Sequence, residues 1–234
     1  MIRLKAFRTT QNQEACERFA HGHEQILRDF GVEKVTSADR SWMFNPDVYV
    51  ITVENESGSK IYGGSRIHVA TDNQKLPVQD AIGEMDSGIH DMVKQDAKAG
   101  AGEMCALWNA KEIRGSGVSV VLTKASVAKA GVEIANLLKI KTLWVLCAPY
   151  TVGMVERAGF KVVKSLGKDG QFPYPRPDLP ATILRLDDTD ALKTADEENK
   201  SAIFDLRKTP VQNKVEYGPN GEIIVDYDLY IEDL

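Results

Sequence analysis

A glycine-rich turn between an apolar run and a long amphipathic segment is the part of the sequence best suited to chemistry. Residues 102–109 are strand-like, the turn is Arg114-Gly-Ser-Gly117, and residues 118–138 follow it. Glycines remove side-chain bulk where the next helix begins, so unpaired backbone amides and the positive end of the helix dipole can face one anion. This pattern predicts a strand, a pyrophosphate-binding loop and a helix.

The segment after the turn has the spacing of a helix with one apolar face. Its apolar residues recur at intervals of three and four: Val118, Val121, Leu122, Ala125, Ala128, Val132, Ala135 and Leu138. We therefore expect a helix over residues 118–138 that packs against the core.

Two other phosphate-binding motifs do not fit this turn. A dinucleotide fingerprint needs a third glycine where Val120 stands, and no acidic ribose ligand closes a following strand. A P-loop needs a lysine directly after its last glycine, and here Gly117 is followed by Val118. The turn therefore belongs to neither class.

The turn instead resembles motif A of the GNAT acetyltransferase superfamily, in which a Gln/Arg-x-x-Gly-x-Gly/Ala loop binds the pyrophosphate of acetyl-coenzyme A. One register starts at Arg114, with Gly117 in the fourth place and Ser119 in the last, and the other starts at Glu112. We prefer the Arg114 register because a carboxylate facing a phosphate is unfavourable.

The later part of the sequence is also similar to this family. A strand-like run at residues 142–147 is followed by Glu156-Arg-Ala-Gly-Phe160, which looks like the family's terminal Gly-Phe signature. The resemblance covers roughly residues 1–186, and we expect a GNAT-like acyltransferase domain over this range.

The resemblance implies an α/β (α+β) fold with a mixed, mainly antiparallel central sheet flanked by helices. It also implies transfer of an acetyl group from acetyl-CoA to a primary amine of a small molecule or peptide. Backbone groups of Trp108, Asn109 and Ala110 would pair with pantetheine as an extra strand. The residues that would bind the pyrophosphate are Arg114, Gly115, Ser116, Gly117, Val118 and Ser119.

Glu103 is the candidate general base that the resemblance suggests, because the family often places a carboxylate on the central strand. Its neighbours Met104, Ala106 and Leu107 are apolar and would raise the pKa of its carboxyl group toward neutrality. The alternative is a residue at the end of the strand that faces solvent after Gly102.

The general acid of the family is usually a tyrosine four residues before the terminal Gly-Phe, where this sequence has Val155. Tyr150 is the hydroxyl nearby that can replace it and protonate the departing thiolate. The alternative is that Pro149 and Tyr150 only start a helix.

A second resemblance is to the acyl-homoserine-lactone synthases, which share the GNAT fold. Gly64 and Arg66 are close to the Gly-x-x-Arg of their third strand, and Trp42 is the counterpart of an amino-terminal aromatic residue. The sequence departs from their Glu-x-x-Arg, because Ala106 stands at the arginine position after Glu103. The resemblance to these synthases implies a long acyl chain on the donor and S-adenosylmethionine as the acceptor. A non-catalytic acyl-CoA sensor is a further alternative.

Other elements follow from local patterns. We expect an outer strand at residues 2–7, a helix that ends near Gly31, and a hairpin of residues 48–53 and 60–69. A short helix is expected within residues 78–101 and a last strand at 181–186, with a proline-rich surface excursion at 167–180.

For two groups of residues, one aromatic and one polar, two roles are open. Trp42-Met43-Phe44 lies either under the sheet or along a substrate pocket. His90, with Glu84, Asp86 and Asp91, either reaches the acceptor pocket or belongs to an exposed helix of mixed charge.

Residues 187–234 differ in composition from the rest. An acidic stretch from Asp187 reads as a linker or an exposed helix, and Gly218-Pro-Asn-Gly221 between alternating apolar runs predicts a β-hairpin. A hairpin is not stable alone, so it should dock on the sheet or on a second subunit. We therefore expect a C-terminal extension with a possible homodimer through the hairpin.

Composition restricts the function further. The 234 residues carry a net charge of −5 without a large basic block, which argues against a nucleic-acid partner. The sequence has three separated cysteines, Cys16, Cys105 and Cys147, which suggest buried free thiols and a reducing compartment. No signal peptide or membrane-spanning run is apparent, so we expect a cytoplasmic protein with no membrane partner. His21 and His23 lie two residues apart on a helix, a poor metal pair, and we expect partly exposed side chains and no metal.

Overall fold

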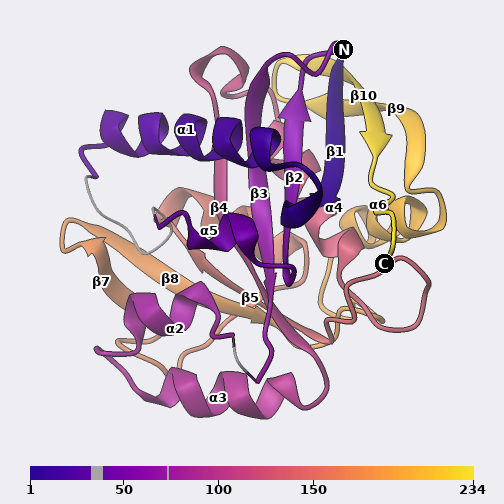
Figure 1. Ribbon diagram of the computed structural model, residues 1–234. Coiled ribbons are helices and arrows are strands. Elements are labelled where there is room, and N and C mark those ends of the chain that lie inside the picture. The colour runs from indigo at the N-terminus through magenta and orange to yellow at the C-terminus, as the bar shows by residue number, and fades with distance from the viewer. Residues whose placement is uncertain (33–38, 73) are drawn as a thin grey trace.

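The computed structural model describes residues 1–32, 39–72 and 74–234, and it shows one large sheet with helices on both faces (Figure 1). The sheet has ten strands in the order β6-β8-β5-β4-β3-β2-β1-β10-β9, and β7 pairs with β8. The strands are β1 (Ile2–Arg8), β2 (Val48–Glu54), β3 (Ile61–Val69), β4 (Ala101–Asn109), β5 (Thr142–Cys147), β6 (Lys161–Val162), β7 (Gln171–Arg176), β8 (Leu179–Leu186), β9 (Val211–Gly218) and β10 (Gly221–Asp228).

Most neighbouring strands are antiparallel, and the β4–β5 and β1–β10 pairs are parallel. The predicted mixed, mainly antiparallel sheet is therefore confirmed. The predicted hairpin is β9–β10, which docks on the sheet of its own chain beside β1.

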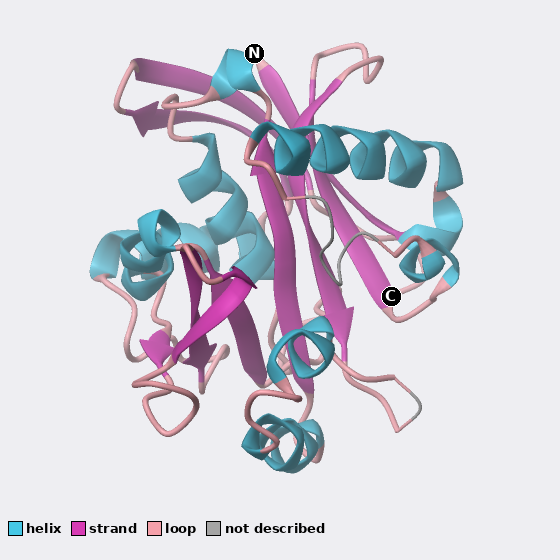
Figure 2. Cartoon of the chain, turned by 90° about the vertical axis from the view of Figure 1, so that its left-hand side faces the viewer, coloured by secondary structure: helices cyan, strands magenta, loops and turns pink. Residues whose placement is uncertain are grey.

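Six α-helices of the described residues flank the sheet: α1 (Gln13–Asp29), α2 (Pro77–Ile82), α3 (Gly88–Ala97), α4 (Val118–Lys129), α5 (Val152–Arg157) and α6 (Glu197–Lys208). Alternate residues of a strand point to opposite faces of the sheet, so the hydrophobic core is divided between the two faces. Ile51, Ile67 and Met104 pack with α4, α5 and α6, whereas Val50 packs with α1 and Trp144 with α2 and α3. Figure 2 shows helices on both sides of the strands, with α1 on one side and α4 on the other.

Helix α4 ends at Lys129, nine residues before the predicted end at Leu138. Ala130 is extended, and Gly131 has a φ of +121° and bridges to Ile140. Val132 is 40% exposed, so the apolar spacing beyond Lys129 belongs to a loop. The prediction followed the apolar spacing past Lys129, although the chain turns away from the helix axis at the extended Ala130 and at Gly131.

The predicted excursion at residues 167–180 is largely a second hairpin. Gln171 and Phe172 of β7 pair with Thr182 and Ala181 of β8, and the Phe172 side chain is buried. An outer strand tolerates prolines because its outward amides need no partner, and the sequence prediction missed this strand for that reason. The single helix expected within 78–101 is instead the pair α2 and α3.

The C-terminal extension packs into the same core as the rest of the chain. Leu192, Ile203, Leu206 and Val225 are buried in the cluster that also holds α4. Of the two alternatives for the acidic stretch, a helix holds for its last part, which begins α6; the N-cap Asp196 accepts a hydrogen bond from the Asn199 amide. Within the described part of the chain, no helix has both the length and the apolar character needed to cross a bilayer.

Candidate active site

A β-bulge in the central strand β4 opens the sheet next to β5. The register between β3 and β4 shifts where Gly64 opposes Trp108 and Arg66 opposes Cys105, and Ala106 between them has a φ of +50°. On its other side β4 pairs with β5 over residues 101–103 and 142–144. Beyond this pairing the two strands border a cleft of about 500 Å³. The bulge therefore separates strands that would otherwise continue as a closed sheet.

The walls of the cleft are mainly apolar along its length. They include Met104, Leu107, Val145, Leu146, Met154 and Val155. Apolar walls with a few polar groups are typical of a small-molecule site. Cys105 lies on this wall and is half-buried, whereas Cys16 and Cys147 are buried as predicted.

Part of the glycine-rich turn lines the cleft. Gly115 and Gly117 have φ values of +75° and +94°, a conformation that favours glycine, and Gly117 is the N-cap of α4. Arg114, Gly115 and Ser119 line the cleft. The first amides of α4 have no partner within the helix, so this end suits an anion.

The other residues of the turn have different surroundings. The Ser116 hydroxyl donates to the Ile113 carbonyl over 2.6 Å, and the Val118 side chain is buried in the core with α4. The Arg114 guanidinium lies 5.5 Å from the ring centre of Phe30, which also lines the cleft. The turn is thus held between α4 and the end of α1.

The three residues expected to pair with pantetheine differ in whether their backbone groups are already hydrogen-bonded to β3. The Ala110 amide donates to the Tyr62 carbonyl over 2.6 Å, so this amide is used by β3. Backbone groups alternate in direction along a strand, which directs those of Asn109 toward the open edge of β4. The Asn109 side chain donates to Ser119 over 2.6 Å, and Trp108 is buried against α1.

Glu103 is buried, with 2% of its surface exposed, and does not face solvent. Its Oε2 accepts a 2.7 Å hydrogen bond from the Val78 amide in the first turn of α2. Burial raises the pKa of Glu103 to about 8, opposed by the hydrogen bond from Val78 and by the positive charge of Arg66. The predicted rise in the pKa of Glu103 is therefore present. Helix α2 covers the carboxyl group and excludes water from it.

Three more side chains, those of Arg66, His68 and Cys105, lie on the same face of the sheet as Glu103. His68 opposes Glu103, and Arg66 opposes Cys105, in the β3–β4 register. Arg66 is 1% exposed and lies 4.3 Å from the ring centre of Trp42, and burial lowers its pKa. Burial and the charge of Arg66 lower the pKa of His68 well below its ordinary value, so its ring is neutral at neutral pH.

Arg66 and His68 line a second cavity of about 350 Å³ on the α1 and α2 face of the sheet. Trp42 and Phe44 line it as well, and Trp42 is also buried against α1, so both alternatives for this residue hold. Asp39 and Asp80 add carboxylates to its lining. The sequence analysis missed His68, although its place two residues after Arg66 on one strand gave the signal.

Tyr150 lines the first cleft and is 72% exposed. It belongs to a single 3-10 turn, Pro149–Thr151, that leads into α5, so it both starts the helical segment and borders the cleft. Val155, at the usual position of the family's tyrosine, is buried on the cleft wall.

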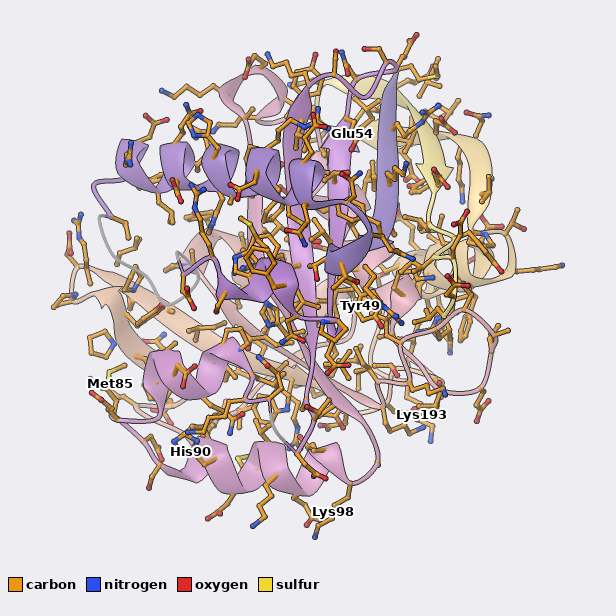
Figure 3. All side chains as sticks on the ribbon, in the orientation of Figure 1. Tyr49, Glu54, Met85, His90, Lys98 and Lys193 are labelled. Carbon is orange, nitrogen blue, oxygen red and sulfur yellow. The ribbon has the colours of Figure 1, made fainter. Side chains whose placement is uncertain are left out.

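The prediction for His23 is wrong, and of the two alternatives for His90 the structure favours the surface helix. His23 was expected to be partly exposed, but it is buried and lines the cleft, and burial lowers its pKa to about 4. His90, labelled in Figure 3 beside α2 and α3, lies 3.2 Å from Gln79 through its Nδ1. It links these two helices and is not among the described residues that line either cavity.

Comparisons with known proteins place this arrangement among solved structures. No family model matches the sequence, and no curated protein matches it. The N-acyl amino acid synthase FeeM from uncultured soil microbes is similar, with a TM-score of 0.56 and 13% identity over 86% of this chain and 98% of that chain. The acyl-homoserine-lactone synthase LasI has a TM-score of 0.57 and 13% identity over 88% and 95% of the two chains.

An acyl-CoA N-acyltransferase from Pseudomonas aeruginosa is also similar, with a TM-score of 0.55 and 10% identity over 79% of this chain and 99% of that chain. These structures share the mixed sheet flanked by helices. At such low identity the likeness concerns the architecture of the chain.

Proposed function

We propose that this chain, which has the fold of the GNAT acyltransferases, is an N-acyltransferase that moves an acetyl group from acetyl-CoA to a primary amine. The observation that carries this proposal is the cleft opened by the bulge at Ala106. It has the glycine turn at one end, and Cys105, on its wall, opposes Arg66, which lines the second cavity. A donor and an acceptor can therefore meet at β4 from two sides.

The donor fits the first cleft by its chemistry. Its diphosphate would bind the amides of the turn and the first turn of α4, with Arg114 as counter-charge. Its pantetheine would extend along the open edge of β4 at Asn109. The acyl group would then lie near the bulge, between the apolar walls.

The acceptor fits the second cavity. This cavity is lined by Arg66 and His68 of β3, and His68 is the direct partner of Glu103 of β4 in the register. Glu103 itself is not among the described residues that line the cavity. An amine must lose a proton to attack a thioester, and Glu103 in its ionised form is the base for this proton. The raised pKa of Glu103 makes it basic enough for this role near pH 8.

The reaction balances without a metal or a redox step. The amine nitrogen forms a bond to the thioester carbon and gives one proton to the Glu103 carboxylate. A backbone amide at the β4 bulge stabilises the oxyanion until the carbon–sulfur bond breaks. The departing thiolate takes a proton from the Tyr150 hydroxyl, which recovers one from water.

A second candidate function is an acyl-homoserine-lactone-synthase-like transfer of a longer acyl chain. The likeness to LasI and the buried Arg66 support it. This function would use S-adenosylmethionine as acceptor. A non-catalytic sensor would bind the donor in the same cleft and release no CoA.

The test is a thermal-shift titration followed by a thiol-release assay on the full chain. We expect acetyl-CoA at about 100 times its Kd to stabilise the chain by about 2.7 kcal/mol. Gly117→Glu should abolish this shift because its Cβ atom would lie 2.9 Å from the Gly218 Cα and its positive φ favours glycine, so the substitution displaces the glycine turn. With a panel of primary amines, Glu103→Gln should keep the shift and lower CoA release by about 100-fold or more.

Each alternative gives a different result. Absence of a shift with every CoA ester contradicts the proposal. A shift with long acyl-CoA or S-adenosylmethionine alone supports the second candidate. Binding without CoA release from any amine supports the sensor.

Tyr150→Phe should lower the rate by less than Glu103→Gln, because water can protonate a thiolate.

A further inference from the structure

The turn of the C-terminal hairpin lies directly against the glycine turn, about one hundred residues away in sequence. A Cβ atom added to Gly218 would lie 1.8 Å from the Ser116 carbonyl oxygen. A Cβ atom added to Gly117 would lie 2.9 Å from the Gly218 Cα, and one added to Gly115 would lie 3.6 Å from Asn220 Nδ2. The two turns therefore touch through backbone, and glycine is needed on both sides of the contact.

A buried polar group fixes the hairpin to the helix that the glycine turn starts. Lys124 of α4 and Glu216 of β9 form an ion pair of 2.5 Å, and both side chains are more than nine-tenths buried. The Tyr227 hydroxyl of β10 donates to the other Glu216 oxygen over 2.8 Å. Separating the hairpin from α4 would leave a buried charge without its partner, which is strongly unfavourable.

The glycine turn thus has one surface toward the hairpin and one toward the cleft. The cleft surface holds Arg114, Gly115 and Ser119. Trp108 lines the same cleft, and its buried Nε1 has no hydrogen-bond partner in the described part of the chain. Asn220 is exposed, and its Nδ2 lies beside Gly115, which lines the cleft; Asn220 itself is not among the described residues of that lining.

We propose that the hairpin turn is part of the donor site, with Gly218 positioning the glycine turn and Asn220 presenting its side-chain amide to the diphosphate of CoA. This inference rests on the proposed function, because the diphosphate is the anion that the turn would hold. An amide donating to a phosphate oxygen forms a charge-assisted hydrogen bond, which is stronger than a neutral one. The C-terminal extension then contributes directly to donor affinity.

The experiment measures binding of CoA and of dephospho-CoA to the full chain by calorimetry. Asn220→Ala should weaken both ligands by about three- to tenfold. Asn220→Asp should weaken them more, because it places a carboxylate beside the diphosphate. Equal losses for the two ligands identify the diphosphate, since dephospho-CoA lacks only the 3′-phosphate.

Gly218→Ala tests the positioning role. The added methyl group must displace the Ser116 carbonyl, so CoA affinity should fall. In the thiol-release assay the KM for acetyl-CoA should rise while kcat changes little, a split that general loss of structure does not produce.

Matched controls lie on the same chain. Asn213→Asp makes the same charge change on β9 away from the turn, and Gly153→Ala adds a Cβ where no atom lies within 4 Å. Both controls should bind CoA as the unchanged chain does. CoA affinity within about twofold of the unchanged chain for both Asn220 variants and for Gly218→Ala would overturn the inference. Failure of the unchanged chain to bind CoA would overturn the proposed function and this inference with it.

Discussion

Burial of Glu103 has two opposite consequences at the level of one residue. It raises the pKa of the carboxyl group to about 8, so a fraction of the chains holds a carboxylate strong enough to remove a proton from an amine near that pH. The same burial disfavours the ionised form inside the protein. If Glu103 is the base, as proposed, the rate and the stability should depend on pH in opposite directions through this residue.

We expect the rate of CoA release to rise about tenfold per pH unit below pH 8 and to level off above it, because only ionised Glu103 accepts a proton. A pH profile of kcat/KM measures this directly. A profile that is flat between pH 6 and about pH 9 would contradict a role for Glu103 as the base.

The stability of the fold should change in the opposite sense. Between the ordinary pKa of 4.5 and about 8, the folded chain holds a proton on Glu103 that the unfolded chain has lost, so the free energy of unfolding falls as pH rises. At pH 7 this amounts to about 3 kcal/mol. Glu103→Gln, which keeps an oxygen for the Val78 amide, should remove that pH dependence in urea unfolding curves; unchanged curves would argue that the carboxyl group is not held in its neutral form.

At the scale of elements, the end of α4 depends on a side chain from α6. The Arg207 guanidinium donates to the carbonyl oxygens of Val127, Ala128 and Ala130 at 3.0–3.2 Å and to Thr189 at 2.8 Å. The last carbonyls of a helix have no partner within it, and here they are buried. The helix can therefore stop at Lys129 without leaving these groups unpaired.

Arg207→Met should lower the free energy of unfolding by about 3 kcal/mol, because several buried carbonyls lose a charged donor. Chemical denaturation checks this value. Arg40→Met is the control, since Arg40 pairs with the carboxylates of Glu17 and Glu24 at the surface and should change stability by less than about 1 kcal/mol. Equal effects of the two substitutions would show that Arg207 does not stabilise the end of α4.

At the scale of the whole molecule, the hairpin extends the sheet and leaves β9 as its outer strand (Figure 1). One face of the hairpin exposes apolar side chains, with Val215 at 43%, Ile224 at 51% and Tyr217 at 78%. Val215 and Ile224 are direct partners in the register, so they form one patch. An outer strand with such a patch is suited to pairing with another strand.

Association of two copies through this hairpin stays a prediction of the sequence. We expect light scattering during gel filtration to give twice the mass of the chain. The double variant Val215→Glu and Ile224→Lys should give the single mass, because charges on both partners of the patch disfavour its burial. A single mass for the unchanged chain at high concentration would rule out this dimer.

The sequence by itself determined the features that depend on neighbouring residues. Glycines at positions 115 and 117 and the periodicity from Val118 predicted the turn and the start of α4, because backbone freedom and helical spacing are local properties. Alternation and turn residues likewise predicted most strands and the C-terminal hairpin. The fold implied by the resemblance to GNAT proteins and to acyl-homoserine-lactone synthases agrees with the architecture of the similar solved structures.

Only the tertiary structure decided which polar groups share one site. The bulge at Ala106 sets the β3–β4 register, and that register brings His68 beside Glu103 and Arg66 beside Cys105. Contact between Gly218 and Ser116 joins residues about one hundred positions apart. Such placements depend on strand pairing and packing across the whole chain, and a local pattern carries no information about them.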